Sequence, residues 1–171
     1  MTAAIHAAPD AEHVVDVYGG SGVYAVETAR RGRDVTLVET DAVLDVVGPM
    51  LAGQGVETVT TTGDEVPVDD ADLALLAGVV NRRSSEANQT LLSRVHDALT
   101  PGGTAAVLTP EDGAEARRVR VERLLCGSGD AYTAETVTGW LGDAGFVDCE
   151  TWDVTGGEGR LVVGRCERGV D

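Results

Sequence analysis

Short apolar runs alternate with helix-like segments along the whole 171-residue chain, and this alternation constrains the fold more than any other feature. Apolar runs separated by amphipathic segments are typical of a sheet whose strands are joined by helical crossovers, which connect parallel strands. The length fits one domain. We therefore expect residues 1–171 to form a single α/β domain with a Rossmann-like, three-layer α/β/α arrangement.

The apolar runs and turn residues also predict where the individual elements lie. The expected strands are 13–18, 35–39, 56–61, 73–79, 104–108, 147–154 and 160–167, and the expected helices are 22–31, 41–53, 84/85–98, 114–125 and 134–144. "GDEVPVDDAD" is expected to be a loop, and "TPGG" is expected to end the helix before the fifth strand. The loop "TGGEG" predicts a hairpin, which adds an antiparallel strand to the parallel sheet.

Acidic residues dominate the charge of the chain. There are 29 of them against 13 basic residues, all of which are arginine, so the formal net charge is −16. Such a surface repels phosphates and anionic lipids, so we expect neither nucleic acid nor a membrane as partner. No apolar run reaches the roughly 18 residues of a membrane span, and the N-terminus lacks a basic signal-peptide head. A soluble, cytoplasmic protein is expected.

The cysteines and histidines do not form a recognisable metal-binding pattern. Cys126, Cys149 and Cys166 are widely spaced and odd in number, so no disulfide framework or zinc knuckle is expected. His6, His13 and His96 share no ligand spacing with one another or with the cysteines. We therefore predict no metal site.

A glycine-rich turn follows the first apolar run. In "GGSGVYA", Gly20, Gly22 and Ala25 have the spacing G-x-G-x-x-A, and Glu39 lies about 20 residues beyond the first glycine. Glycines let a ligand approach the backbone, and a carboxylate that ends the second strand can accept both ribose hydroxyls. A dinucleotide or S-adenosylmethionine fits this pattern, and a purely structural turn remains the alternative.

Three further features favour S-adenosylmethionine. Asp16 lies where a carboxylate can meet the ammonium of the ligand, whereas it would repel a pyrophosphate. Asp64, in "GDEV" after the third strand, is placed to accept a hydrogen bond from an adenine amino group. The terminal hairpin is unlike the second half of a dinucleotide-binding fold.

Five motifs occur in an order that resembles a known family: "VVDVYGGSG", "VTLVE", "GDEVP", "LLSRVHDALTPGG" and "WLGDAGF". From Val14 onward the chain resembles the catalytic domain of class I S-adenosylmethionine-dependent methyltransferases, particularly the plant-like small-molecule O-methyltransferases. The resemblance implies a seven-stranded sheet with the last strand inserted antiparallel. It also implies that Glu39 holds the ribose, that Asp64 meets the adenine, and that the methionine end is lined by Asp16, Gly19, Gly20 and Gly22.

The sequence departs from this family at the position of the general base. The family has a histidine followed by aspartate after strand four, where this chain has Asn81 and Arg82, and asparagine cannot act as a base. A supporting glutamate corresponds to Ala131, with Asp130 beside it. A nitrogen, thiolate or acidic hydroxyl acceptor needs no such base. Arg82 and Arg83 are either placed to bind a carboxylate or phosphate on the acceptor or are solvated loop residues.

Two other departures concern the N-terminus and Tyr18. Only residues 1–12 precede the first strand, so no separate cap or dimerisation domain is expected. The acceptor side is then open, unless a second copy or a partner subunit covers it. Tyr18 stands where the family has glycine, and it is tolerable if its backbone needs no positive φ and its ring points away or forms a pocket wall.

We therefore expect methyl transfer from S-adenosylmethionine to a small-molecule acceptor near Asn81, Arg82 and Arg83. One alternative is a catalytically degenerate methyltransferase fold that serves as a cofactor-binding or interaction module. A less favoured alternative is an NAD-binding oxidoreductase, which depends on the glycine spacing alone.

The excess of acidic residues predicts a salt-dependent stability. Such a composition resembles that of proteins from salt-loving microbes, because molar salt shortens the Debye length to about 3 Å and screens the self-repulsion. The free energy of unfolding, measured by denaturant titration at increasing salt concentration, is expected to rise. Full stability in dilute buffer would instead indicate an acidic protein of an ordinary cytoplasm.

Overall fold

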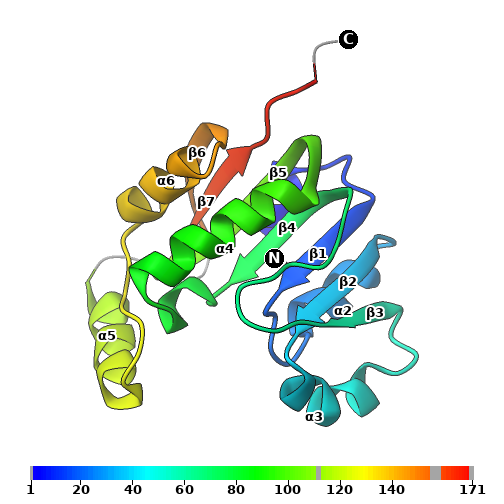
Figure 1. Cartoon of the computed structure of the whole chain (residues 1–171), viewed down its shortest axis with the longest axis horizontal. Coiled ribbons are helices and arrows are strands. Elements are labelled where there is room, and N and C mark those ends of the chain that lie inside the picture. Colours follow the sequence, from blue (N-terminus) through cyan, green and yellow to red (C-terminus); the bar gives the residue numbers. More distant parts are fainter. Residues whose placement is uncertain (1, 111–112, 155–158, 170–171) are drawn as a thin grey trace.

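Seven strands form one mixed sheet in the order β3-β2-β1-β4-β5-β7-β6 (Figure 1). The computed structural model describes residues 2–110, 113–154 and 159–169. The strands are β1 (His13–Val17), β2 (Asp34–Glu39), β3 (Val56–Thr60), β4 (Ala71–Ala77), β5 (Leu99–Pro110), β6 (Val147–Asp153) and β7 (Gly159–Arg165). Strands β3, β2, β1, β4 and β5 pair in parallel, and β7 runs antiparallel to both β5 and β6. The expected fold class is confirmed.

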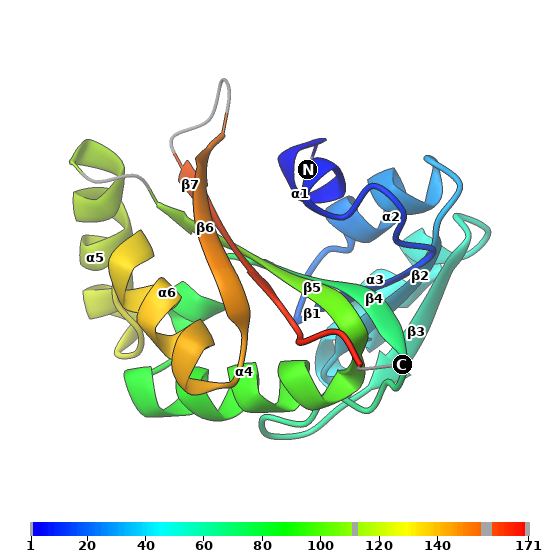
Figure 2. The same ribbon diagram turned by 90° about the horizontal axis from the view of Figure 1, so that it is seen from above.

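Helices cover both faces of the sheet (Figure 2). One face carries α1 (Thr2–Ala7), α2 (Val23–Ala29) and α3 (Asp41–Leu51), and the other carries α4 (Ser85–Ala98) and α6 (Ala134–Asp143). The helix α5 (Ala114–Cys126) contacts β5 and the short 3₁₀ turn η1 (Val80–Arg82). Both faces of the central strands are therefore buried.

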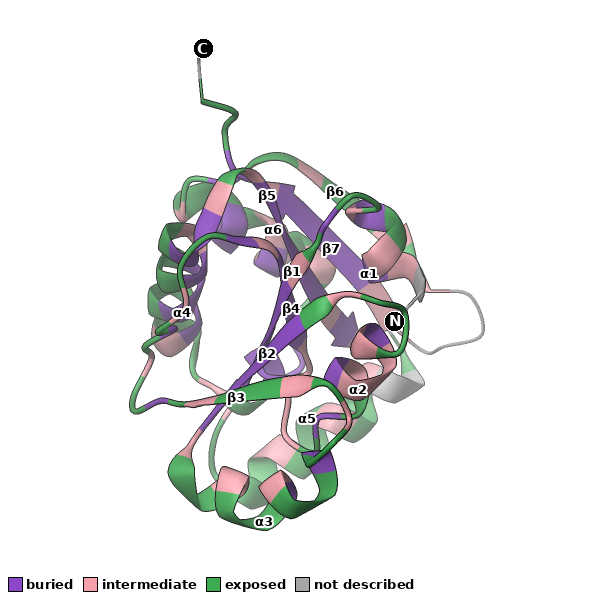
Figure 3. Ribbon diagram, turned by 90° about the vertical axis from the view of Figure 1, so that its right-hand side faces the viewer, coloured by how far each residue is buried: buried purple, intermediate pink, exposed green. Residues whose placement is uncertain are grey.

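The core consists of two clusters separated by the sheet. In β1, Val15 and Val17 pack in the cluster of α4 and α6, whereas Val14 packs in the cluster of α1, α2 and α3. This division follows from the alternation of side chains along a strand. Figure 3 shows the buried central strands and the largely exposed edge strand β3. Burial on both faces explains why β1 and β4 are almost continuously apolar.

The predicted helix 84/85–98 is confirmed, and the structure decides between its two candidate caps. The Ser84 hydroxyl accepts a hydrogen bond from the Ala87 N–H at 3.2 Å. Such a bond satisfies one of the free donors of the first turn. Leu91 and Val95 are fully buried against the sheet, as the helical spacing predicts. The Asn88 amide of this helix also donates to the Val80 carbonyl at 2.8 Å, which ties the helix to η1 before it.

Strand β4 differs from the expectation at both ends. Ala71 and Asp72, expected in a loop, belong to β4, because Ala71 pairs with Leu99 and the Asp72 carboxylate accepts the N–H groups of Glu12 and His13 at 3.0 and 2.9 Å. Strand β4 also ends two residues earlier than expected. Tertiary pairing decided both ends of this strand.

The helix before "TPGG" ends at Ala98 as expected, but the segment itself lies within β5 and is not a separate loop. The hydroxyl of Thr100 bonds to the Ala71 carbonyl at 3.4 Å, and the Gly103 carbonyl accepts the Cys166 N–H at 2.8 Å. Gly102 has a φ of 83° and the register between β4 and β5 shifts here, so the segment is an irregular part of β5 that neighbouring strands hold in place. The expected hairpin joins β6 and β7, and residues 155–158 of its "TGGEG" loop lie outside the described residues.

Among the described residues, no helix is long and apolar enough to cross a membrane.

Candidate functional site

The glycine-rich turn connects β1 to α2 at the carboxyl end of the sheet. Gly20 and Gly22 have φ angles of 62° and 71°, a region that glycine adopts without strain. Gly22 is the N-cap of α2, and a Cβ at this position would lie 2.8 Å from a methyl carbon of Leu51 in α3. Conformation and packing both require a residue without a side chain here.

Asp16 lies directly beneath this turn and is fully buried. A Cβ on Gly19 would lie 2.3 Å from an oxygen of its carboxylate, so a side chain at position 19 is sterically excluded. Burial raises the pKa of Asp16 to about 7, the nearby Ala25 N–H offsets part of the rise, and the charge of Glu39 adds to it. Neither carboxylate oxygen of Asp16 has a hydrogen-bond partner of normal geometry within the described part of the chain. A cationic ligand group would satisfy this carboxylate.

Glu39 ends β2 beside the same turn and is also buried. Its Oε1 accepts the N–H of Gly20 at 3.2 Å, and its Oε2 accepts the N–H of Thr40 at 2.7 Å. Because β1 and β2 are parallel neighbours, their carboxyl ends meet at one edge. The glycine turn, Asp16 and Glu39 are thus brought together as the spacing predicts.

Tyr18 differs from the expectation that its backbone needs no positive φ. Its φ is 54°, in the left-handed region, which is unusual for a bulky residue. The ring is buried, and its hydroxyl donates a hydrogen bond to the Gly63 carbonyl at 2.6 Å. The guanidinium of Arg82 donates to the Tyr18 carbonyl at 3.1 Å. These contacts hold the strained conformation, since they fix both the ring and the peptide group.

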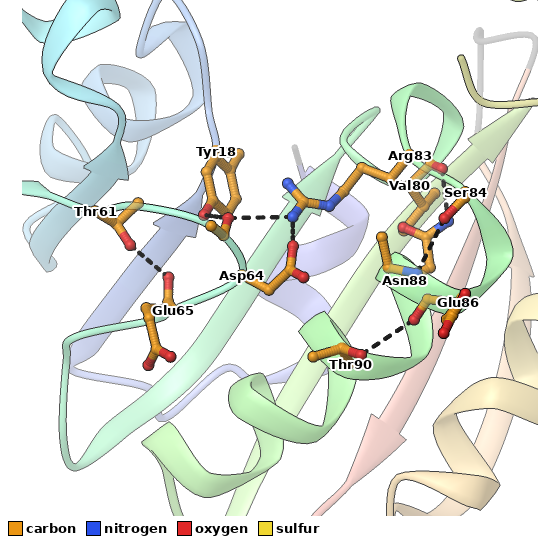
Figure 4. Close-up of polar contacts among 12 residues, drawn as sticks. Tyr18, Thr61, Asp64, Glu65, Val80, Arg83, Ser84, Glu86, Asn88 and Thr90 are labelled. Atoms are coloured by element: carbon orange, nitrogen blue, oxygen red, sulfur yellow. Dashed lines mark hydrogen bonds and ion pairs between the residues drawn. The ribbon is translucent and has the colours of Figure 1, made fainter.

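Asp64 and Arg83 form an ion pair between the loop after β3 and the turn after β4 (Figure 4). The Arg83 guanidinium also lies over the Tyr18 ring, 4.8 Å from its centroid, and donates to the Gly63 carbonyl at 3.3 Å. Both charged side chains keep partial exposure, at 18% for Arg83 and 32% for Asp64. The residue predicted to meet adenine and one predicted to bind the acceptor therefore contact each other.

Asn81 lies in η1, which begins three residues after the end of β4, and only 8% of it is exposed. Its Oδ1 is buried without a hydrogen-bond partner among the described residues. The backbone around it is held from two sides. The amide of Asn88 donates to the Val80 carbonyl at 2.8 Å, and Gly129 packs so closely that a Cβ there would lie 2.0 Å from the Asn81 carbonyl oxygen.

The loop before α6 does not supply a free base. The Asp130 carboxylate is paired with Arg120 at 2.8 Å and accepts the Ala131 N–H at 2.7 Å. The hydrogen bond from Arg120 is the main reason that the pKa of Asp130 is lowered. Tyr132 donates its hydroxyl to the Arg83 carbonyl at 3.0 Å. This loop therefore packs against the turn after β4 and helps to hold it in place.

The predicted site residues thus form two adjoining groups and one separate position. The first group lies in and around the glycine turn and consists of Asp16, Gly19, Gly20, Gly22 and Glu39. The second links this turn to the neighbouring loops and consists of Tyr18, Asp64, Arg82 and Arg83. Asn81 lies beyond both groups. Sequence reasoning missed the contacts of Gly63, Gly129 and Tyr132. The only signals in the sequence were the glycines of "TTGD" and "GSGD", since a glycine can allow another segment to approach the backbone closely.

The described residues contain no group of three or more histidine, cysteine, aspartate or glutamate side chains placed to hold a metal ion. The three cysteines are free, with Cys126 exposed and Cys166 buried.

Comparisons with known proteins identify relatives for this arrangement, although no protein-family model matches the chain. Over 111 residues, which are 60% of this chain and 32% of the relative, it is 32% identical to the tetracenomycin polyketide synthesis 8-O-methyl transferase TcmO of Streptomyces glaucescens. It is also 32% identical, over 57% of its length and 39% of the relative, to the ubiquinone/menaquinone biosynthesis C-methyltransferase UbiE of Rubrivivax gelatinosus.

Human N-acetylserotonin methyltransferase, solved in complex with S-adenosylmethionine, superposes with a TM-score of 0.85 at 20% identity. The match covers 97% of this chain and 51% of the human protein. The chain thus spans about a third to a half of the length of these proteins.

The fold and the comparisons agree. The chain has the α/β fold of S-adenosylmethionine-dependent methyltransferases, and the proteins that it resembles include an O-methyltransferase and a C-methyltransferase. These relatives support S-adenosylmethionine as the cofactor. The donor set agrees with that ligand, because a buried carboxylate without a partner among the described residues suits its ammonium, and the glycine turn suits its methionine backbone.

The burial of Asp16 predicts a specific pH dependence of stability. Its folded-state pKa of about 7 exceeds the ordinary value of 3.8, so the folded state holds the proton more tightly. The stabilisation of the folded state by this protonated carboxyl group is complete below pH 3.8 and is lost as the pH rises through about 7. The unfolding free energy of the wild type, relative to Asp16→Asn, should fall by about 4 kcal/mol over this window.

Chemical denaturation at several pH values measures this difference. Asp34→Asn, which alters an exposed carboxylate at the start of β2, is the matched control. Parallel pH profiles for the wild type and Asp16→Asn would contradict the assignment.

Proposed function

We propose that the protein binds S-adenosylmethionine at the carboxyl ends of β1, β2 and β3 and transfers a methyl group to a small-molecule acceptor near Asn81 and Arg82. The observation that supports this most directly is the buried carboxylate of Asp16, which lies against the backbone of Gly19 and has no hydrogen-bond partner of normal geometry in the described part of the chain, with the Glu39 carboxylate beside the same turn.

Each cofactor contact follows from the chemistry of the residue. Asp16 would meet the ammonium of the methionine part, and the positive charge would favour the ionised form that burial disfavours. Glu39 would accept the ribose hydroxyls, in addition to the N–H groups of Gly20 and Thr40. Asp64 would accept the adenine amino group, and Arg83 would have to share or release that carboxylate.

Bound S-adenosylmethionine supplies a methyl group on a sulfonium, which is already reactive toward a nucleophile. The contribution of this chain is then to position the acceptor, and orientation alone yields effective molarities of roughly 10⁵–10⁸ M in favourable systems. Asn81 can orient an acceptor but cannot remove its proton. Asp130 is engaged by Arg120. The proposal therefore favours acceptors that need no general base.

A cofactor-binding module without catalysis is the second candidate. Two observations favour it: an asparagine at the position of the family's base, and the ion pair that occupies Asp64. Incubation with labelled S-adenosylmethionine and a panel of acceptors separates the candidates. Cofactor binding without transfer to any acceptor supports the module, whereas labelled product supports the enzyme.

The cofactor assignment predicts a role for Glu39. Isothermal titration at high salt should detect binding of S-adenosylmethionine and of its demethylated product. Glu39→Gln should weaken binding by at least about tenfold, because hydrogen bonds to a charged acceptor are worth about 1.5–3 kcal/mol. Glu57→Gln, in the exposed part of β3, should leave the dissociation constant unchanged. Binding of neither ligand to the wild type would refute the assignment.

Tyr18 provides an independent test of where the cofactor lies. Glycine adopts a φ of 54° freely, so Tyr18→Gly should preserve folding while removing the ring from the site. The dissociation constant for S-adenosylmethionine should change. Tyr18→Phe, which loses only the hydrogen bond to Gly63, separates the effect of the ring from that of the hydroxyl. An unchanged constant in Tyr18→Gly would show that the ring faces away from the cofactor.

A further inference from the structure

A cavity of about 410 Å³ lies at the carboxyl ends of β4 and β5, beside Asn81. Its walls are mainly aliphatic and include Leu75, Leu108 and Leu161 from β4, β5 and β7. Ala4 of α1 and Tyr24 of α2 border it on the face that Figure 2 shows covered by these helices. A volume of this order fits a small molecule of one or two rings.

Asn81 supplies a polar group to this apolar wall. Its Oδ1 is buried and has no hydrogen-bond partner among the described residues, although the surrounding backbone is firmly held by Asn88 and Gly129. A buried acceptor without a donor is unfavourable, so a ligand that brings an N–H or O–H gains by satisfying it. The aliphatic walls disfavour an ion, because burying an unpaired charge is costly. A ligand that suits this wall is therefore apolar, uncharged and a hydrogen-bond donor.

Arg82 and Arg83 are not among the residues that line the cavity. Arg82 bonds to the Tyr18 carbonyl, and Arg83 is paired with Asp64. Their side chains thus belong to the cofactor side of the turn after β4. An anionic acceptor in the cavity would therefore not contact the guanidinium groups of these two arginines.

We propose that this cavity is the acceptor site and that it binds a compact, uncharged amine, whose N–H donates to Oδ1 of Asn81 and whose nitrogen receives the methyl group. This inference rests on the proposed function. It specifies the class of acceptor from the chemistry of the cavity wall, and it names nitrogen as the methylated atom.

The choice of nitrogen follows from what an amide oxygen can do. Asn81 accepts a hydrogen bond but does not take the proton, so the bound group reacts with its hydrogen in place. A neutral amine still has a lone pair in that state, whereas a neutral hydroxyl is a weak nucleophile until it is deprotonated.

The nitrogen lone pair forms the new bond to the methyl carbon, and the electron pair of the broken carbon–sulfur bond stays on sulfur. The positive charge thereby passes from sulfonium to nitrogen. The amide oxygen of Asn81 stabilises that growing charge through the N–H, and the proton then leaves to water.

Binding of three probes of similar size, without cofactor, tests the inference. Indoline is an aromatic secondary amine that is neutral at pH 7.5, indane is its hydrocarbon analogue, and benzoate is an anion. Ligand-observed NMR titration should show indoline binding about five- to tenfold more tightly than indane, as one hydrogen bond allows, and benzoate binding least.

Asn81→Leu should reduce the preference for indoline over indane to within about twofold, since it keeps the side-chain size and removes the acceptor. Gln89→Leu, an exposed amide of α4, should leave the preference unchanged. Circular dichroism confirms that both variants fold. If Asn81→Leu does not fold, the wild-type ratio alone decides: equal binding of indoline and indane, or preferred binding of benzoate, overturns the inference.

Labelled methyl transfer to indoline and to phenol, with the wild type, tests the nitrogen assignment. Product from indoline supports it, and product from phenol alone overturns it. The proposed function has a separate test, since titration with S-adenosylmethionine needs no acceptor. Cofactor binding together with no preference for indoline would refute only the acceptor class, whereas a preference for indoline without cofactor binding would refute the proposed function.

Discussion

The close contact between the Asp16 carboxylate and the backbone of Gly19 is the constraint around which the rest of the site is arranged. A side chain at position 19 would overlap the carboxylate, so the turn after β1 can close over a buried acid only with glycine there. This closure leads the chain into α2 and places the Glu39 carboxylate beside the Gly20 N–H. A buried acid without a partner costs stability, and such cost is typical of functional sites.

A second set of contacts ties this turn to segments that are distant in sequence. The Tyr18 hydroxyl reaches Gly63, the Arg83 guanidinium covers the Tyr18 ring and pairs with Asp64, and Tyr132 reaches the Arg83 carbonyl. The loops after β1, β3 and β4 therefore behave as one connected unit. Tyr18 makes fixed contacts that a glycine at this position could not make. Its backbone must adopt a left-handed φ, which is strained for a residue with a side chain.

Much of the fold was predictable because its signals are local. Apolar runs and helical spacing identified the seven strands and most of the helices, and Ser84 was one of two candidate caps. The errors lie where backbone pairing overrides local preference. Asp72 looks like a loop residue among acidic neighbours, yet it receives two N–H groups from the start of β1. The "TPGG" segment is an irregular part of β5, with Gly102 at a φ of 83°, whereas its sequence alone indicates a loop that ends a helix.

The sequence by itself determined the order of the elements, the glycine turn and the acids at the ends of the first three strands, because these depend on spacing along the chain. Only the tertiary structure decided that Arg83 pairs with Asp64, that Tyr18 adopts a positive φ, and that the Asn81 amide borders an apolar cavity. Each of these depends on which segments the parallel sheet brings to one edge. Contacts between residues tens of positions apart arise from strand order and helix packing, which local sequence patterns do not encode.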